Sequence, residues 1–229
     1  MTDEKTNEEV QFGALFYPTT DGRGNEVKFD ELYIPYIYRE IYFEGVYIDI
    51  LNNQKDMTIL DIGANIGVTV QHFRNFAKKV YAVEPLLEHF AALKKNKEFN
   101  NWDNVEIFNA AISGKDGEVT MHRNPANRTC ASYVLEYPGQ TEAVKAIAFD
   151  TFFEENNIEK IDFCKFDVEG AEDDILRSEG FKKVCDKIKA IEVEFHFPTW
   201  TSLVEYMQEL GYTARRYESS AIIVLFTRP

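Results

Sequence analysis

The stretch MTILDIGANIG, residues 57–67, holds the two features that decide the fold. Its first six residues form a short apolar run typical of a buried strand, and Gly63 and Gly67 follow directly. A glycine-containing turn between a strand and a helix places backbone N–H groups at the carboxyl end of a sheet, where open α/β folds bind ligands. The stretch therefore predicts an α/β fold with a ligand site at this turn.

Outward from this turn, apolar runs alternate with amphipathic stretches, which indicates βαβ units and a parallel sheet. The expected strands are residues 57–62, 80–84, 105–111, 161–168 and 189–195. The expected helices are residues 66–76, 85–99, 151–157, 171–178 and 199–210. The last helix ends at Gly211, and YTARRYE and IIVLFT then read as two strands joined by a tight turn. The predicted sheet is mostly parallel and ends in an antiparallel hairpin.

The pattern divides the chain into a main domain and two less regular parts. Residues 47–229 form the α/β domain, and residues from about 117 to 149 break its alternation with short β-like pieces that predict a β-rich insertion. Residues 1–46 read as an N-terminal tail followed by a helical cover, because MTDEKTNEEV is acidic and polar and residues 29–47 are rich in tyrosine and isoleucine.

The composition of the chain restricts the cellular location and the classes of binding partner that we expect. The 229-residue chain carries a formal net charge of -14, which opposes binding to nucleic acid. It has no apolar run of about 18 residues, so no membrane span is expected. Cys130, Cys164 and Cys185 lie far apart, which favours free thiols in the cytoplasm over disulfides or a zinc site.

The polar groups of the turn favour S-adenosylmethionine over a dinucleotide. A dinucleotide-binding loop would have a glycine where this chain has Asn65, so that the pyrophosphate could approach the backbone. The Asn65 amide and the Asp61 carboxylate instead suit an amino acid zwitterion beside a sulfonium cation. Glu84 follows the glycine loop by about 20 residues and can accept both hydroxyls of a ribose. No GxxxxGK[ST] motif is present, which excludes a P-loop.

Five segments together resemble the FkbM-type methyltransferases: DIGANIGVT, VEPL, NAAISGKDGEV, KFDVEGAEDDIL and IEVEFH. The resemblance runs from about residue 47 to residue 196. It implies a Rossmann-like class I methyltransferase sheet of seven strands and, often, O-methylation of sugars or natural-product hydroxyls. The residues expected to bind the cofactor are Asp61, Gly63, Asn65, Gly67, Thr69, Glu84, Pro85, Ala111 and Asp167.

Three residues at predicted strand ends are the catalytic candidates. Asp167 could accept a proton, hold the amino group of the cofactor or ligate a divalent ion. Glu194 and His196 are two residues apart, so they share a face of their strand and could act as an acid/base pair. The sequence does not decide which of the three is the base. Their spacing gives no octahedral ligand set, so no metal ligand is assigned.

Other polar residues receive structural or peripheral interpretations. Lys165 alternates with apolar neighbours and is expected to be an interior lysine paired with an acid. Glu172 reads as helix first-turn charge. In the insertion, Arg128, Thr129 and Ser132 are expected to border the acceptor site.

The expected function is O-methylation of a hydroxyl on a small molecule or glycan. An N-methyltransferase and a non-catalytic adenosyl-binding module remain open alternatives, whereas Asn65 argues against a NAD-dependent oxidoreductase. The tyrosines before residue 50 could form a lid or a homodimer face, and the acceptor itself is not specified by the sequence.

Overall fold

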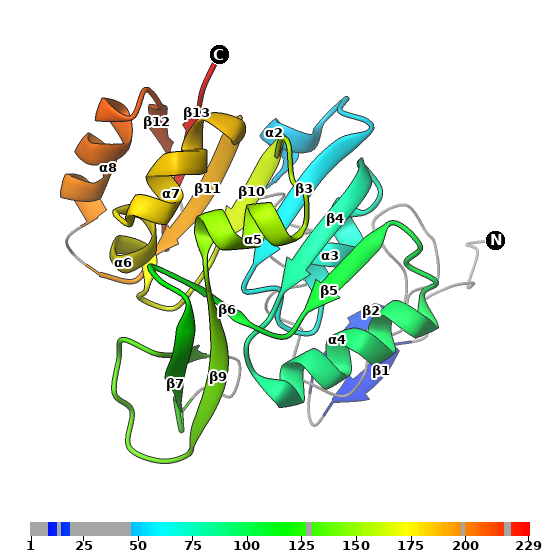
Figure 1. Ribbon diagram of the computed structural model, residues 1–229. Coiled ribbons are helices and arrows are strands. Elements are labelled where there is room, and N and C mark those ends of the chain that lie inside the picture. Colours follow the sequence, from blue (N-terminus) through cyan, green and yellow to red (C-terminus); the bar gives the residue numbers. More distant parts are fainter. Residues whose placement is uncertain (1–8, 13–14, 19–46, 127–129, 198–199, 218–220) are drawn as a thin grey trace.

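The computed structural model of the chain describes residues 9–12, 15–18, 47–126, 130–197, 200–217 and 221–229. A seven-stranded sheet forms its centre, with strand order β12-β13-β11-β10-β3-β4-β5 (Figure 1). Its strands are β3 (Met57–Ile62), β4 (Ala77–Val83), β5 (Val105–Phe108), β10 (Phe163–Phe166), β11 (Ala190–Phe195), β12 (Thr213–Arg216) and β13 (Ile222–Thr227). Strand β13 runs antiparallel to both β11 and β12, and the other pairings are parallel. The mostly parallel sheet with a C-terminal hairpin is thus confirmed.

Helices cover both faces of this sheet because side chains of successive strand residues point to opposite sides. Ile59 and Phe163 pack in one apolar cluster, whereas Leu60 and Phe166 pack in another. The first cluster includes residues of α2 (Ile48–Leu51), α3 (Val68–Phe73) and α4 (Leu87–Phe99). The second includes residues of α5 (Phe149–Glu155), α6 (Glu172–Leu176), α7 (Glu179–Val184), the 3-10 turn η2 (Cys185–Lys187) and α8 (Trp200–Glu209).

Several predicted elements have different bounds in the structure, and three of these differences have a clear structural reason. The predicted helix 66–76 starts later, because Gly67 caps α3 in the left-handed region with φ of 92°. The predicted helix 171–178 corresponds to α6. The helix α7 was not predicted and begins directly after it, where the Ser178 hydroxyl accepts a hydrogen bond from Phe181 N. The predicted strand 105–111 ends at Phe108, and its last residue begins a strand of a second sheet.

The second sheet has four strands in the order β6-β9-β7-β8. They are β6 (Ala111–Ser113), β7 (Gly117–Arg123), β8 (Ala131–Ser132) and β9 (Thr141–Ala148). Strand β9 lies between β6, to which it is parallel, and β7, to which it is antiparallel. The β7–β9 ribbon extends below the main sheet in Figure 1. Residues of the expected insertion thus form β7, β8 and β9.

The N-terminal region departs from the predicted tail. Strands β1 (Glu9–Phe12) and β2 (Leu15–Pro18) form an antiparallel hairpin. The expected cover over residues 29–46 lies outside the described residues, as do Arg128 and Thr129. Within the described residues, no helix combines the length and the apolar character needed to span a membrane.

Candidate active site

A cavity of about 330 Å³ opens at the carboxyl ends of β3, β4, β10 and β11. The second sheet and the loop after β8 contribute Met121, Ala131 and Tyr133 to its wall. Of the predicted site residues, those that line the cavity are Gly63, Asn65, Thr69, Glu84, Pro85, Ala111, Asp167, Glu194 and His196. Asp61 and Gly67 are not among the lining residues.

Both glycines of the loop make close contacts inside the protein. Gly63 has φ of +79°, and a Cβ there would lie 1.9 Å from the carbonyl oxygen of Asp167. Gly67 has φ of +92°, and a Cβ there would lie 2.6 Å from Leu93 and 2.8 Å from Trp102. Chain packing and the left-handed backbone therefore require glycine at both positions, independently of any ligand.

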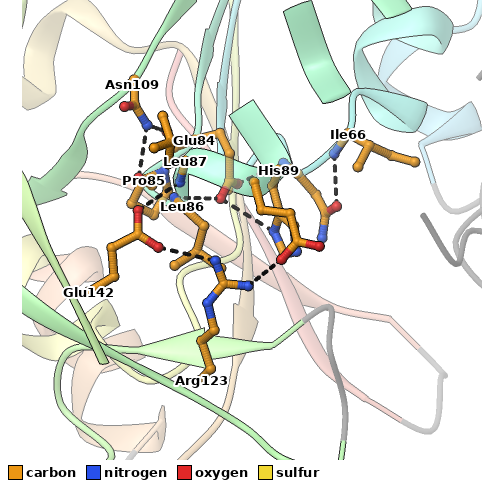
Figure 2. Close-up of polar contacts among 12 residues, drawn as sticks. Ile66, Glu84, Pro85, Leu86, Leu87, His89, Asn109, Arg123 and Glu142 are labelled. Carbon is orange, nitrogen blue, oxygen red and sulfur yellow. Dashed lines mark hydrogen bonds and ion pairs between the residues drawn. The ribbon is translucent and has the colours of Figure 1, made fainter. Parts of the chain in front are cut away.

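Glu84 is fixed at one end of the cavity by backbone groups (Figure 2). Its side chain is buried and accepts hydrogen bonds from Asn65 N at 2.9 Å and from Leu86 N at 3.0 Å. His89 Nδ1 lies 3.5 Å from Glu84 Oε1, and the Asn109 amide donates to the Glu84 carbonyl at 3.0 Å. A carboxylate offers about four lone-pair positions, so these contacts leave acceptor capacity for a ligand.

The second sheet is tied to the start of α4, next to Glu84 (Figure 2). Arg123 of β7 donates to Glu88 of α4 at 2.7 Å and to Glu142 of β9 at 3.1 Å. Glu142 in turn accepts a hydrogen bond from Leu87 N at 2.9 Å. These contacts hold the second sheet against the wall that carries Glu84.

A row of charged side chains crosses the middle of the main sheet. Lys165 is paired in register with Asp61 of β3 and with Glu192 of β11. Its Nζ lies 3.4 Å from Asp61 Oδ1, 3.4 Å from Asp167 Oδ2, and donates to the Gly63 carbonyl at 3.0 Å. Lys165 is therefore an interior lysine paired with acids, as expected.

The charged side chains of this row shift one another's pKa values. Burial opposes the charge of Lys165, but Asp61, Asp167 and Glu194 outweigh it and raise the pKa of Lys165 above its ordinary value. Burial raises the pKa of Asp61, although Lys165 and the Thr69 hydroxyl both favour its charged form. Thr69 lines the cavity while its hydroxyl donates to Asp61 at 2.5 Å.

His196 lies among four carboxyl groups at the other end of the cavity. Its Nδ1 is 2.8 Å from Glu172, and its Nε2 is 3.5 Å from Glu169, 3.8 Å from Asp167 and 3.9 Å from Glu194. Burial lowers its pKa, but the hydrogen bond with Glu172 and the charges of Asp167 and Glu169 prevail and raise the pKa to about 9. The raised pKa favours the protonated imidazole at neutral pH, which makes the carboxylates the better candidates for the base.

Sequence reasoning gave three of the carboxyl groups near the cavity no role in the site. Glu172 is buried and accepts from Gly170 N at 3.0 Å, so it does more than supply first-turn charge. Glu169 has φ of +52° and lines the cavity, and burial raises its pKa. Glu192 also lines the cavity. The detectable signal for Glu192 was its spacing of two and four residues from Glu194 and His196, which puts all three on one strand face.

A cation-binding arrangement is also present among the described residues. Ligand atoms of Asp167, Glu169 and His196 lie within 4.8 Å of one another, a set that could hold a divalent ion. The interpretation of the sequence had combined Asp167 with Glu194 and His196 for this role. We assign no metal ligand.

Comparison with known proteins gives consistent matches. The profile described as the methyltransferase FkbM domain matches residues 61–214. The 2-O-methyltransferase NoeI of Sinorhizobium fredii is 26% identical over 164 residues, which cover 63% of this chain and 65% of that protein. Methyltransferase 1 of Beauveria bassiana is 25% identical over 170 residues, covering 64% and 68%. The matched part therefore spans about two thirds of these curated relatives.

A solved structure supports the fold. The crystal structure of methyltransferase FkbM from Methylobacillus flagellatus aligns with a TM-score of 0.57 at 15% identity. The alignment covers 83% of this chain and 47% of that one. At this identity the likeness establishes a shared fold.

Proposed function

The chain belongs to the methyltransferase FkbM family, and from this premise we propose that it transfers the methyl group of S-adenosylmethionine to a hydroxyl of a small molecule or glycan. One observation carries the proposal: a single cavity joins the buried Glu84 carboxylate to the cluster of Asp167, Glu194 and His196. The name of the Sinorhizobium relative, a 2-O-methyltransferase, supports oxygen as the methylated atom.

The residues present fit the cofactor. Glu84 would accept the ribose hydroxyls with the lone pairs that Asn65 N and Leu86 N leave unused. Ala111 and Ile112 of β6 give an apolar wall for the adenine. We assign Asn65 and Asp167, which both line the cavity, to the amino acid portion of the cofactor, whose positive charges suit the acidic lining. When bound, the cofactor supplies the electrophilic methyl group.

The side chains around Asp167 orient it for proton transfer. Its Oδ2 lies 3.4 Å from Lys165 Nζ and its Oδ1 lies 3.8 Å from His196 Nε2, so a cation faces each oxygen. We assign Asp167 the role of accepting the acceptor's hydroxyl proton, and His196 and Lys165 the role of positioning it. The surrounding walls exclude water and align the two reactants.

N-methylation is the second candidate, because the acidic lining would also attract a cationic amine. An amine bound as a cation must lose a proton before it can attack a methyl group. Assays with matched alcohols and amines distinguish the two reactions.

Thermal unfolding with S-adenosylhomocysteine, and with NAD in parallel, tests the cofactor assignment. At about a hundred times its dissociation constant the ligand should stabilise the protein by roughly 2.7 kcal/mol. Glu84→Gln should weaken this effect, whereas Glu98→Gln, at an exposed position of α4, should not. A shift with NAD alone, or none with S-adenosylhomocysteine, would overturn the proposal.

A further inference from the structure

Glu192 lies in the middle of the sheet, at the wall of the cavity. It belongs to β11, and its neighbours in register are Lys165 of β10 and Leu225 of β13. Only 4% of the residue is exposed, yet it lines the cavity together with Tyr47 and Lys165. A carboxyl group at this depth faces a ligand and not bulk water.

The carboxyl group of Glu192 has one oxygen without a hydrogen-bond partner in the part of the chain that the structure describes. Its Oε2 is buried and lacks a hydrogen bond. The ion pairs of Lys165 go to Asp61 and Asp167, and none joins Lys165 to Glu192 among the described residues. A buried polar group without a partner destabilises the folded state. Its presence in a cavity wall is explained if a ligand supplies the missing hydrogen bond.

The charge state of Glu192 indicates the chemistry of that ligand. Burial raises its pKa well above the ordinary value, Glu194 adds to the shift, and Lys165 opposes it. A carboxyl group accepts hydrogen bonds in either charge state and donates one when protonated, and a hydroxyl group can meet both requirements. Asp61, Asp167 and Glu194 nearby would repel an acceptor of net negative charge.

We propose that Glu192 binds a second hydroxyl of the methyl acceptor, so that the acceptor is an uncharged sugar or other polyol. The inference rests on the proposed function, because it takes Asp167 as the group beside the methylated hydroxyl. Asp167 follows the register partner of Glu192 by two residues, a separation of about 7 Å along the strand direction. An acceptor that contacts both side chains therefore needs two hydroxyls on opposite sides of a ring-sized molecule.

Saturation-transfer NMR tests the proposal, with methyl α-D-glucopyranoside, myo-inositol and cyclohexylamine as probes and S-adenosylhomocysteine at saturation. The wild-type protein should bind at least one of the two polyols. Glu192→Gln, whose amide also donates and accepts, should keep the polyol affinity within about threefold. Glu192→Leu should lose about tenfold, the order expected for one hydrogen bond. Glu209→Leu, exposed on α8, should behave as wild type.

The outcomes of the NMR experiment distinguish failure of this inference from failure of the proposed function. Binding of S-adenosylhomocysteine without binding of either polyol would overturn this inference and leave the proposed cofactor intact. If the wild-type protein does not bind S-adenosylhomocysteine, the proposed function itself is overturned. Binding of cyclohexylamine alone would point to an amine acceptor and also contradict the inference.

Thermal unfolding of the same variants separates a ligand-binding role from a structural one. If Glu192 awaits a ligand, Glu192→Leu should unfold at the same temperature as wild type or higher, because it removes a buried unpartnered group. A lower unfolding temperature for both Glu192→Leu and Glu192→Gln, or failure of both to fold, would show that the carboxyl group supports the sheet and would overturn the inference.

Discussion

The backbone carbonyl of Asp167 occupies the space that a side chain on Gly63 would need, at 1.9 Å from the ideal Cβ position. Asp167 N also donates to the Ile62 carbonyl at 3.2 Å. The loop after β3 and the loop after β10 are therefore in direct contact. One glycine thus sets the distance between the loop that carries Asn65 and the residue proposed to accept the proton.

Replacing Gly63 with alanine should destabilise the protein strongly, since the new methyl group would displace the Asp167 loop. We expect a loss of at least about 2 kcal/mol beyond the cost of a left-handed φ. Gly211→Ala is the matched control, because Gly211 has φ of +92° and its nearest neighbour would lie 3.5 Å away. Urea denaturation measures both variants, and equal losses would refute the steric argument.

Lys165→Met should leave Asp61 buried without its cation. Breaking such a pair typically costs about 3–5 kcal/mol in the free energy of unfolding. Because burial already raises the pKa of Asp61, the loss should be smaller at pH 5 than at pH 8, where the folded protein must bury the charge. Lys160→Met, which removes an exposed lysine 2.8 Å from Asp162, should cost under about 1 kcal/mol. Similar losses for both variants would contradict the buried pair.

The stability of the protein should depend on the charge of His196. Its pKa is raised from 6.5 to about 9, so the stabilisation is fully present below pH 6.5 and is lost as the pH rises through 9. This contribution to the free energy of unfolding is at most about 3 kcal/mol. Denaturation curves of wild type and His196→Gln should therefore converge between these pH values. Parallel curves would show that the carboxylates around His196 do not hold its proton.

Asp167→Asn should reduce turnover far more than cofactor binding, because an amide cannot accept the hydroxyl proton. General base catalysis contributes about 10²-fold or more, so a loss of that order is expected in kcat. The affinity for S-adenosylhomocysteine should change by less than about tenfold. Asp173→Asn, at an exposed position of α6, serves as the control. Unchanged turnover with an acceptor found for the wild type would remove Asp167 from the mechanism.

Much of the fold could be predicted because its signals are local. Residues 57–67 combine an apolar run with two glycines at the spacing of a strand–turn–helix unit. The structure places β3 and the turn there, and α3 begins directly after Gly67. The hairpin of β12 and β13 was predicted from two strand-like segments after Gly211. The end of β5 at Phe108 was missed, because pairing of Ala111 with Ala146 in the second sheet depends on a distant segment.

The sequence by itself determined the α/β class, the mostly parallel sheet, the glycine turn at Gly63 and the acidic residue Glu84 after the next strand. Periodicity and turn chemistry act over a few residues and can be read from the chain. Only the tertiary structure decided the charge state of His196 and the unpartnered position of Glu192. Both depend on side chains from different strands and loops that lie close together only after folding, since burial and charge interactions act through space.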